Sequence, residues 1–417
     1  MRQGSQLVAW AGVWLLLGRA ALGDGIILNG VSARTIGRGG ANIGHFDNAA
    51  VLYDNPAAMS QLPTETTFEL GATLLLTDFR YADAQNDATA QHTLYGLPEF
   101  SIVRSPYDSS WSFGLGAFAP AGFGAIYNLE GPAPFSGTRQ YKSFGTLAKL
   151  LPGVSYRVND RLSIGGTLGL GITVADLEGP YTLQGPTLPG TPTLMNLDVD
   201  GAALCWSVGM MYQLTESTTV GLAYQSESRF EAEGTTHVTT PFGESTYDTQ
   251  LDITWPRSVG LGVRHELCPH RILSTDIIWF DWSSAFDDFG LHLNSPSNGL
   301  FPEAYEQFPL DWRDTVSIRV GYEQLLACDQ TMRFGYVYHR VPIPNDTITP
   351  FIPAALEHAF SLGYGWMWRG WNVDAAYMYT FGPTVTVETS DFLGGDFDDA
   401  RHRAETHAIG LGLMRQY

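Results

Sequence analysis

Residues 111–117 read Trp-Ser-Phe-Gly-Leu-Gly-Ala, so large apolar side chains alternate with small ones. Such strict alternation predicts an extended strand with one apolar face and one small or polar face. The pattern recurs along the chain, for example in Val316–Tyr322 and Phe360–Trp368. In a soluble sandwich the apolar face would form the core. In a membrane barrel it would face lipid, and the other face would line the lumen.

The connectors between the alternating runs favour the membrane barrel. About 14 strands are expected, at 66–76, 98–104, 110–119, 148–157, 161–174, 200–213, 217–230, 248–265, 271–281, 312–325, 330–340, 356–368, 371–381 and 404–417. Short turns such as Asn159-Asp160 alternate with long loops, which centre on 77–97, 120–147, 175–199, 231–247, 282–311, 341–355 and 382–403. Short turns at one rim and long loops at the other are typical of outer-membrane barrels, as is an even strand number. The pattern of strands and connectors therefore predicts that residues 66–417 have an all-β fold, an antiparallel transmembrane barrel.

Composition excludes other classes of protein. The 417 residues contain 43 acidic and 23 basic side chains, a formal net charge of −20, which argues against a nucleic-acid partner. After the N-terminus no run of 18 apolar residues occurs, so a helical membrane protein is excluded. The last strand ends in the aromatic residue Tyr417, as expected of a client of the barrel-assembly machinery.

The first residues predict the compartment. Arg2 precedes the apolar run Leu7–Leu17, and Ala21-Leu22-Gly23 is a small-x-small cleavage site, so residues 1–23 are expected to be a secretory signal peptide. Three cysteines cannot form a disulfide framework. Cys268 and Cys328 fall in successive short turns, and neighbours two strands apart lie about 10 Å from each other, so free thiols are expected.

Residues 24–65 do not follow the strand pattern. They contain Gly37-Arg38-Gly39-Gly40 and Asp47-Asn48-Ala49-Ala50, which are polar, glycine-rich and helix-compatible. A barrel of this size would otherwise leave an open channel, so we expect these residues to form a plug, or hatch, inside the lumen. The alternative is a periplasmic tail.

Several short motifs point to a known family. In chain order they are Gly37-Arg38-Gly39-Gly40-Ala41, Asn55-Pro56-Ala57-Ala58-Met59, Asp311-Trp312-Arg313-Asp314, Arg333-Phe334-Gly335-Tyr336 and Val341-Pro342-Ile343-Pro344. Together they resemble the long-chain fatty acid transporter family (FadL-like) of Gram-negative outer membranes, which includes uptake channels for aromatic hydrocarbons. The resemblance covers essentially the whole mature chain except 282–311 and 391–399.

The resemblance implies a function and a route. It implies a 14-stranded barrel whose hatch carries the motif residues Gly37, Gly39, Gly40, Asn55, Pro56 and Ala57. It also implies passive uptake of long-chain fatty acids or other hydrophobic compounds. The ligand would bind in a groove between extracellular loops, move to an interior pocket, and leave sideways through a kinked strand or downward past the hatch.

A fatty acid needs an apolar trough for its tail and cationic donors for its carboxylate. The loop expected at 120–147 offers both, in Phe123, Ile126, Tyr127, Leu129 and Phe135 with Arg139 and Lys142. The alternative is that these side chains pack one loop against another. Arg313 is a further candidate for binding the carboxylate, unless it pairs with Asp311 or Asp314.

No catalytic residue, cofactor or metal site is expected. Asp391, Asp396, Asp398 and Asp399 supply enough oxygen atoms for Ca²⁺ but lack the EF-hand spacing, which favours a solvated loop. No motif places a Ser–His pair as a lipase would need. A hydrocarbon-specific channel, a general porin and a structural barrel remain as alternatives. The expected partners are hydrophobic small molecules, outer-membrane lipid and lipopolysaccharide, and the expected state is a monomer.

Overall fold

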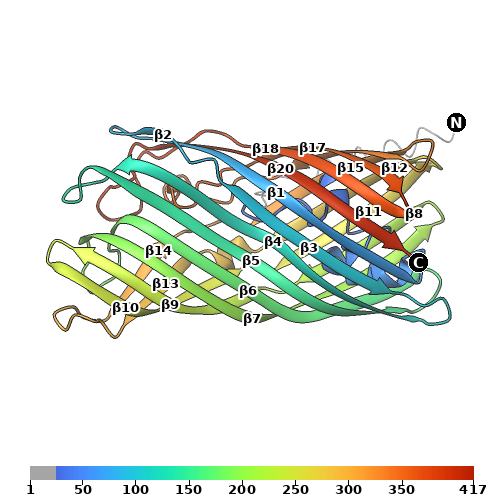
Figure 1. The fold of residues 1–417 in the computed structure, drawn as a ribbon, viewed down its shortest axis with the longest axis horizontal. Helices are drawn as coiled ribbons and strands as arrows, with labels where there is room; N and C mark the ends of the chain where they lie inside the picture. Colours follow the sequence, from blue (N-terminus) through green and yellow to red (C-terminus); the bar gives the residue numbers. More distant parts are fainter. Residues whose placement is uncertain (1–24) are drawn as a thin grey trace.

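The structure is a computed structural model that describes residues 25–417. The predicted signal peptide at 1–23 lies outside the described residues. Residues 66–416 form one antiparallel sheet, which closes into a barrel where the first strand pairs with the last (Figure 1). In the part of the chain that is described, no helix is both long and apolar enough to cross a membrane.

The described residues contain 20 strands. They are β1 (Thr66–Ala82), β2 (Asp87–Thr89), β3 (Leu94–Arg104), β4 (Trp111–Glu130), β5 (Thr138–Arg157), β6 (Leu162–Thr182), β7 (Pro192–Thr215), β8 (Thr218–Gln225), β9 (Ser228–Thr240), β10 (Gly243–Trp255), β11 (Ser258–Cys268), β12 (Arg271–Phe280), β13 (Asp288–Asn294), β14 (Ala304–Pro309), β15 (Thr315–Leu325), β16 (Thr331–Tyr338), β17 (His358–Trp368), β18 (Trp371–Phe381), β19 (Val385–Thr386) and β20 (Arg401–Gln416). Four pairs, β8/β9, β10/β11, β12/β13 and β14/β15, are interrupted halves of single wall strands. With each pair counted once and the short β2 and β19 left out, the wall has the predicted 14 strands.

The prediction of continuous strands at 217–230 and 248–265 is wrong. The first breaks between Gln225 and Ser228, and the second breaks between Trp255 and Ser258 at Pro256. Proline has no N–H to give to a neighbouring strand, so the ladder stops there. Beyond the breaks, β9 and β10 pair with each other over their full lengths as a hairpin.

The predicted long loops at 120–147, 175–199, 231–247 and 282–311 are also largely wrong, because strands occupy most of them. β4, β5, β6 and β7 continue well past the ends expected for them, β9 and β10 fill the third, and α4 (Trp282–Ala285), β13 and β14 fill the fourth. The alternation of inward and outward side chains continues through these extensions. Most of their outward side chains are polar, however, so the apolar pattern that identified the strands is lost.

The outer face of β6 and β7 marks where the membrane ends. Leu168, Leu170 and Ile172 point outward and are exposed, as lipid-facing side chains are. Further along, Asp176 of β6 lies directly opposite Asp198 of β7. Like charges directly opposite each other destabilise a sheet, and the cost would be far greater in lipid. The strand extensions, which project at one end of the barrel (Figure 1), therefore stand in water on the long-loop side, which is the extracellular side of such barrels.

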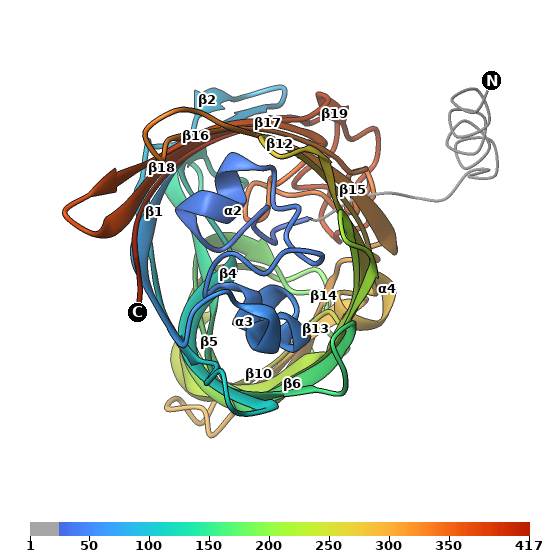
Figure 2. The same ribbon diagram turned by 90° about the vertical axis from the view of Figure 1, so that its right-hand side faces the viewer.

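Residues 25–65 lie inside the barrel, as Figure 2 shows. α2 (Ala33–Gly37) packs against β16, β17, β18 and β20, on one side of the lumen. α3 (Val51–Asp54) and the 3₁₀ helix η1 (Pro56–Gln61) pack against β4, β5, β6 and β7, on the other. This inner segment, called the hatch below, fills space that a barrel of this size would otherwise leave open.

The Asn-Pro-Ala motif of the hatch lies in a notch in the wall. Gly165 of β6, Gly209 of β7 and Gly221 of β8 form the notch. A Cβ at position 165 would lie 2.6 Å from the carbonyl carbon of Pro56, and one at position 221 would lie 2.7 Å from Nδ2 of Asn55. Only glycine leaves room for the hatch backbone to approach this closely.

Asn55 joins the hatch to this notch by hydrogen bonds. Its Nδ2 donates to the carbonyls of Ile43 (2.9 Å) and Met210 (3.2 Å), and its Oδ1 accepts from the N–H of Ala57 (3.2 Å). One side chain therefore links two parts of the hatch to β7.

Asn55→Ala is expected to destabilise the docked hatch by about 1–3 kcal/mol, because it leaves buried carbonyl groups without a donor. Hydrogen–deuterium exchange should become faster in η1 and unchanged in the barrel strands. Asn159→Ala is the control, since Asn159 bonds only within an exposed turn between β5 and β6. Equal exchange of η1 in both variants would contradict the role of Asn55.

Candidate functional site

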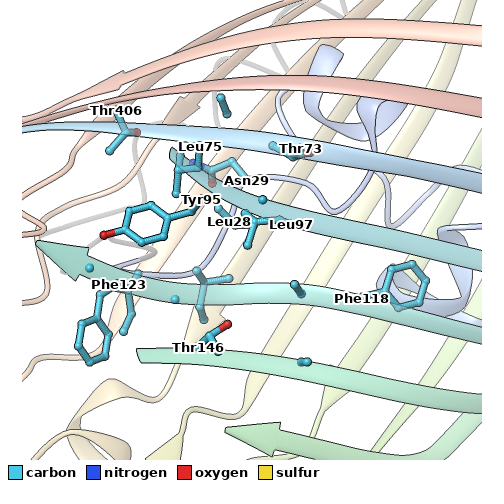
Figure 3. A pocket seen from close by; sticks show the side chains of 18 of the residues that line it. Leu28, Asn29, Thr73, Leu75, Tyr95, Leu97, Phe118, Phe123, Thr146 and Thr406 are labelled. Atoms are coloured by element: carbon cyan, nitrogen blue, oxygen red, sulfur yellow. The ribbon is translucent and has the colours of Figure 1, made fainter. Parts of the chain in front are cut away.

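A cavity of about 680 Å³ lies between the hatch and the wall strands β1, β3, β4 and β5 (Figure 3). Most of its lining is apolar, including Leu28, Leu75, Leu97, Phe118 and Phe123. Pockets of about 300–1,000 Å³ hold ligands of drug size, which is also the size of a long acyl chain or an arene. The cavity is thus suited to one hydrophobic molecule.

The wall beside the cavity is incomplete. Residues Leu94–Glu99 of β3 pair with β1, but the pairing of β3 with β4 begins only at Phe100 and Ala117. The register of β4 with β5 shifts between Phe118 and Ala121, so β4 bulges next to this point. Within the described residues, β3 and β4 therefore have no ladder between them along this stretch.

The cavity opens sideways through this gap. Inward-facing Thr73 and Thr406 line it, and so do Leu94 and Leu150, which are exposed on the lipid-facing side of the wall. A cavity that is lined by both faces of the same sheet passes through the sheet. We call this gap between Leu94–Glu99 of β3 and the bulge of β4 the wall opening.

The beginning of the hatch borders the wall opening. Leu28 donates its N–H to the carbonyl of Pro120 (2.9 Å), and Gly122 donates to the carbonyl of Ile26 (3.1 Å). A β-bridge joins Ile27 to Ala121 between them. The hatch thus satisfies backbone groups that the bulge of β4 leaves unpaired, and the first described residues lie directly against the cavity.

Among the described residues, Lys149 of β5 is the one Lys or Arg side chain in the lining of the cavity, which also contains Glu99 of β3. It is only 8% exposed, and its Nζ lies 5.9 Å from the centre of the Tyr53 ring of the hatch. No carboxylate of the described residues lies within 4.0 Å of it. A buried ammonium group without a counter-ion is costly, so this position favours an anionic or strongly dipolar ligand group.

The predicted loop residues lie mostly elsewhere. Phe123 lines the cavity (Figure 3), whereas Tyr127 and Leu129 are inward-facing strand residues, fully buried in the apolar cluster above it. Ile126 lies on β4 directly opposite Lys142 of β5, outside the cavity lining. These residues belong to a strand extension and not to a loop.

The two predicted cations of this hairpin have protein partners. Lys142 forms an ion pair with Asp176 on the neighbouring strand. Arg139 donates from Nε to the carbonyl of Phe135 in the hairpin turn (3.1 Å). Neither residue, nor Phe135, lines the cavity. The structure therefore does not place Arg139 and Lys142 in the lining of this cavity, because the strands continue and turn these side chains away from it.

Arg313 is exposed, and its backbone N–H donates to the carbonyl of Pro342 (3.0 Å). It lines a separate cleft of about 440 Å³ together with Arg340, away from the cavity. Within the described residues it has no ion pair with Asp311 or Asp314. The structure therefore does not bring Arg313 to the other predicted site residues.

Sequence reasoning missed Lys149, although a signal was present. The alternation of the strand at 148–157 puts residue 149 on the same face as Leu147 and Leu151, the face that lines the lumen. A lysine at such a position, in a chain with only two lysines, marks a charge inside the barrel. The wall opening gave no such signal, because it depends on pairing between strands.

A closed ring of six charged side chains anchors the other side of the hatch. Positive and negative groups alternate around it, and each contacts the next in the order Arg34, Asp47, Arg38, Glu323, Arg333, Asp374. The N–O distances around the ring are 3.6, 2.9, 2.9, 2.7, 2.6 and 2.9 Å. The hatch supplies the first three residues, and β15, β16 and β18 supply the others. We call this the anchor ring.

The glycines of the motif allow the anchor ring to form. Gly39 and Gly40 both have positive φ (68° and 73°), a conformation that glycine adopts without strain. A Cβ on Gly39 would lie 3.1 Å from Cα of Gly335 in β16. The turn after α2 therefore packs directly on the wall and brings Arg38 to Glu323.

One group of potential metal ligands, His45, Asp47 and Glu323, converges within the described residues. Arg38 lies between them, with Nη1 2.8 Å from Nδ1 of His45 and 2.9 Å from Glu323. Burial and the nearby Arg38 lower the pKa of His45 to about 4, so this ring is neutral at pH 7 and accepts a hydrogen bond from Arg38. The guanidinium takes the place that an ion would need.

The four aspartates near the C-terminus do not converge. Asp396 accepts from the hydroxyl of Thr182 (2.6 Å), and Asp398 accepts from the N–H of Ser390 (2.7 Å). Asp391 and Asp399 form no metal-like group with them within residues 25–417. Asp396 and Asp398 therefore hold the extracellular loop in shape.

Comparison with known proteins gives two results from sequence. A family model described as outer membrane protein transport protein (OMPP1/FadL/TodX) matches residues 14–417. No curated protein sequence matches the chain significantly.

Solved structures share the fold. A FadL homologue from Pseudomonas aeruginosa aligns with a TM-score of 0.80 at 19% identity, over 94% of this chain and 100% of that one. The toluene transporter TodX of Pseudomonas putida aligns with a TM-score of 0.79 at 21% identity, over 94% and 99%. The toluene transporter TbuX of Ralstonia pickettii aligns with a TM-score of 0.75 at 17% identity, over 94% and 99%. At these identities the likeness concerns the fold alone.

Proposed function

Because the family model spans nearly the whole chain, the chain belongs to the outer membrane transport protein family OMPP1/FadL/TodX, and we propose that it takes up amphipathic hydrophobic compounds with an anionic head, of the long-chain fatty acid class. It is an outer-membrane transport barrel. No enzymatic step is needed for this function.

The observation that carries the proposal is Lys149, a buried cation in a mostly apolar cavity. Glu99 of β3 also lines this cavity, but its carboxylate lies more than 4.0 Å from the ammonium group of Lys149. The apolar lining suits an acyl tail, since burial contributes about 0.8 kcal/mol per CH₂ group. A carboxylate beside Lys149 would supply the counter-ion that the protein does not provide. Together the two features match a molecule that is apolar along its length and negative at one end.

The proposed route runs from the extracellular mouth to the membrane. The apolar cluster that includes Tyr127, Leu129, Tyr181 and Phe308 is buried above the cavity, so hydrophobic molecules would cross it on their way to the cavity. From the cavity the wall opening leads sideways into the lipid. The hatch blocks the direct way down, because the Asn-Pro-Ala notch and the anchor ring hold it on both sides.

Aromatic hydrocarbons are the second candidate class of cargo. Phe100, Phe118, Phe123 and Phe144 all line the cavity, so it offers several aromatic contacts to a flat neutral ring. A neutral arene would leave Lys149 without a partner, which is why we prefer the anionic amphiphile. TodX and TbuX are toluene transporters, so an arene is the cargo of those two proteins.

Uptake assays test the proposal. Expression in a Gram-negative host that lacks its own transporter of this family should restore uptake of radiolabelled oleate. Uptake of labelled toluene is the parallel arm. Oleate uptake without toluene uptake is the expected result, and the reverse would favour the arene channel. Loss of both would refute hydrophobic uptake.

Ion conductance separates the proposal from a general porin. With the hatch docked, the purified protein in planar bilayers should conduct far less than an open barrel of the same strand number.

We also propose that the protein acts as a monomer, contacts lipopolysaccharide through its lipid-facing wall, and reaches the membrane through the barrel-assembly machinery.

A further inference from the structure

One aromatic side chain lies across the wall opening. Tyr95 is in the part of β3 that pairs with β1 but not with β4, and its direct partner is Leu75 of β1. Its ring reaches over β4 to Phe144 of β5, with 6.0 Å between ring centres and 19° between ring planes. The ring therefore bridges a place where the backbone makes no bond.

The ring of Tyr95 packs on a glycine, Gly124 of β4. A Cβ at position 124 of β4 would lie 2.7 Å from the ring carbon Cζ of Tyr95 and closer still to its hydroxyl. Any other residue at 124 would push the ring away from its stacked position. Gly124 lies directly opposite Phe144 in the β4–β5 pair. The two residues that the Tyr95 ring contacts are therefore neighbours on the outer face of the wall.

We propose that Tyr95 is the gate of the wall opening, a side chain that the cargo must displace to pass between the cavity and the membrane. This rests on the proposed function, because it supposes that cargo uses the wall opening. The ring lines the cavity (Figure 3) and is half-buried, so it contacts the lumen on one side and the outer surface of the wall on the other. This place is at the edge of the membrane, because Phe144 lies opposite Asp176, where the polar strand extensions begin.

The geometry explains how the gate moves without unfolding the wall. The backbone of Tyr95 stays paired with β1, and no ladder bond to β4 has to break. Rotation about the side-chain bonds is enough to lift the ring off Gly124. Such rotations are fast compared with transport. What holds the gate closed is the stacking on Phe144, a contact that slows passage by a modest factor.

The gate is tested first by the release of a bound fatty acid. The probe is cis-parinaric acid, an unlabelled fluorescent C18 fatty acid, chased from purified full-length protein in nanodiscs into vesicles. Tyr95→Ala and Gly124→Ala should release it about two- to ten-fold faster than the wild type, the factor expected for loss of one aromatic contact. Tyr95→Phe keeps the stack and should stay within about two-fold.

Gly96→Ala is the matched control. It is one residue from Tyr95 on the same strand, and a Cβ there would meet nothing within 4 Å. Its release rate should equal that of the wild type. Heat-modifiable migration on gels checks that each variant is folded. If Tyr95→Ala and Gly124→Ala both release parinaric acid at the wild-type rate, the gate is refuted while the proposed function stands.

A second measurement does not depend on cargo. Thr73→Cys places a thiol in the cavity, in a background where the two exposed cysteines, Cys268 and Cys328, are serine. Labelling by a membrane-dissolved pyrenyl maleimide should be several-fold faster with Tyr95→Ala than with Tyr95. This result would support the gate even if the wild type failed to bind parinaric acid, which would count only against the proposed function. Equal labelling rates would overturn the gate.

Discussion

Lys149→Met is expected to weaken the binding of a long-chain carboxylate by about 10- to 100-fold, because a hydrogen bond to a charged group contributes about 1.5–3 kcal/mol. Methionine keeps the length and apolar stem of lysine, so the cavity keeps its shape. Binding of a neutral arene should be unchanged or stronger, since the variant no longer holds an unpaired charge in the cavity. Fluorescence titration with parinaric acid, and competition by toluene, measure the two affinities.

Lys142→Met is the matched control, because Lys142 is the other lysine of the chain and lies outside the cavity, paired with Asp176. Its affinity for the carboxylate should stay within about two-fold of the wild type, as for an exposed ion pair. Equal affinities in the two lysine variants would show that Lys149 does not bind the head group. The arene would then become the preferred cargo.

Arg38→Met is expected to release the hatch from one side of the lumen. Arg38 is fully buried and contacts both Glu323 and Asp47. Removing one partner of a buried ion pair costs about 3–5 kcal/mol, because the other charge stays buried and uncompensated. We expect faster hydrogen–deuterium exchange in α2, ion conductance raised at least about ten-fold, and an unchanged melting of the barrel strands.

The double variant Arg38→Met/Glu323→Met separates lost charge from lost packing. It removes two neighbouring members of the anchor ring and leaves Asp47, Arg34, Asp374 and Arg333, which are still balanced in charge. Conductance should therefore lie closer to the wild type than in Arg38→Met. If the double variant conducts more than the single one, the ring does not anchor the hatch through its charges. Arg104→Met, at an exposed position of β3, controls for loss of an arginine.

Some features of the fold could be recognised from the sequence, and others could not. Trp111–Ala117 and Phe360–Trp368 identified lipid-facing strands because alternation is a local property of neighbouring residues. The strand extensions around Asp176 and Asp198 could not be recognised from alternation, because an outward-facing side chain in water does not need to be apolar. Arg38 was visible in a glycine-rich motif, but its partner Glu323 lies 285 residues further along the chain.

The binding residues show the same limit. Phe123 could be named from composition, and it does line the cavity. Arg139 and Lys142 were equally good candidates by composition, yet strand geometry turns them toward Phe135 and Asp176. Composition says which side chains are available, and only the register of β4 against β5 says which way each one points.

The sequence was sufficient to predict an antiparallel membrane barrel of 14 strands with extra residues at its N-terminus, because period-two alternation and connector length are properties of consecutive residues. The tertiary structure was needed to see that Lys149 enters the cavity without an ion pair among the described residues, that β3 and β4 separate beside it, and that Arg38 belongs to a closed ring of six charges. Each of these depends on contacts between strands far apart in the chain. Such contacts follow from register and closure of the sheet, which no local pattern specifies.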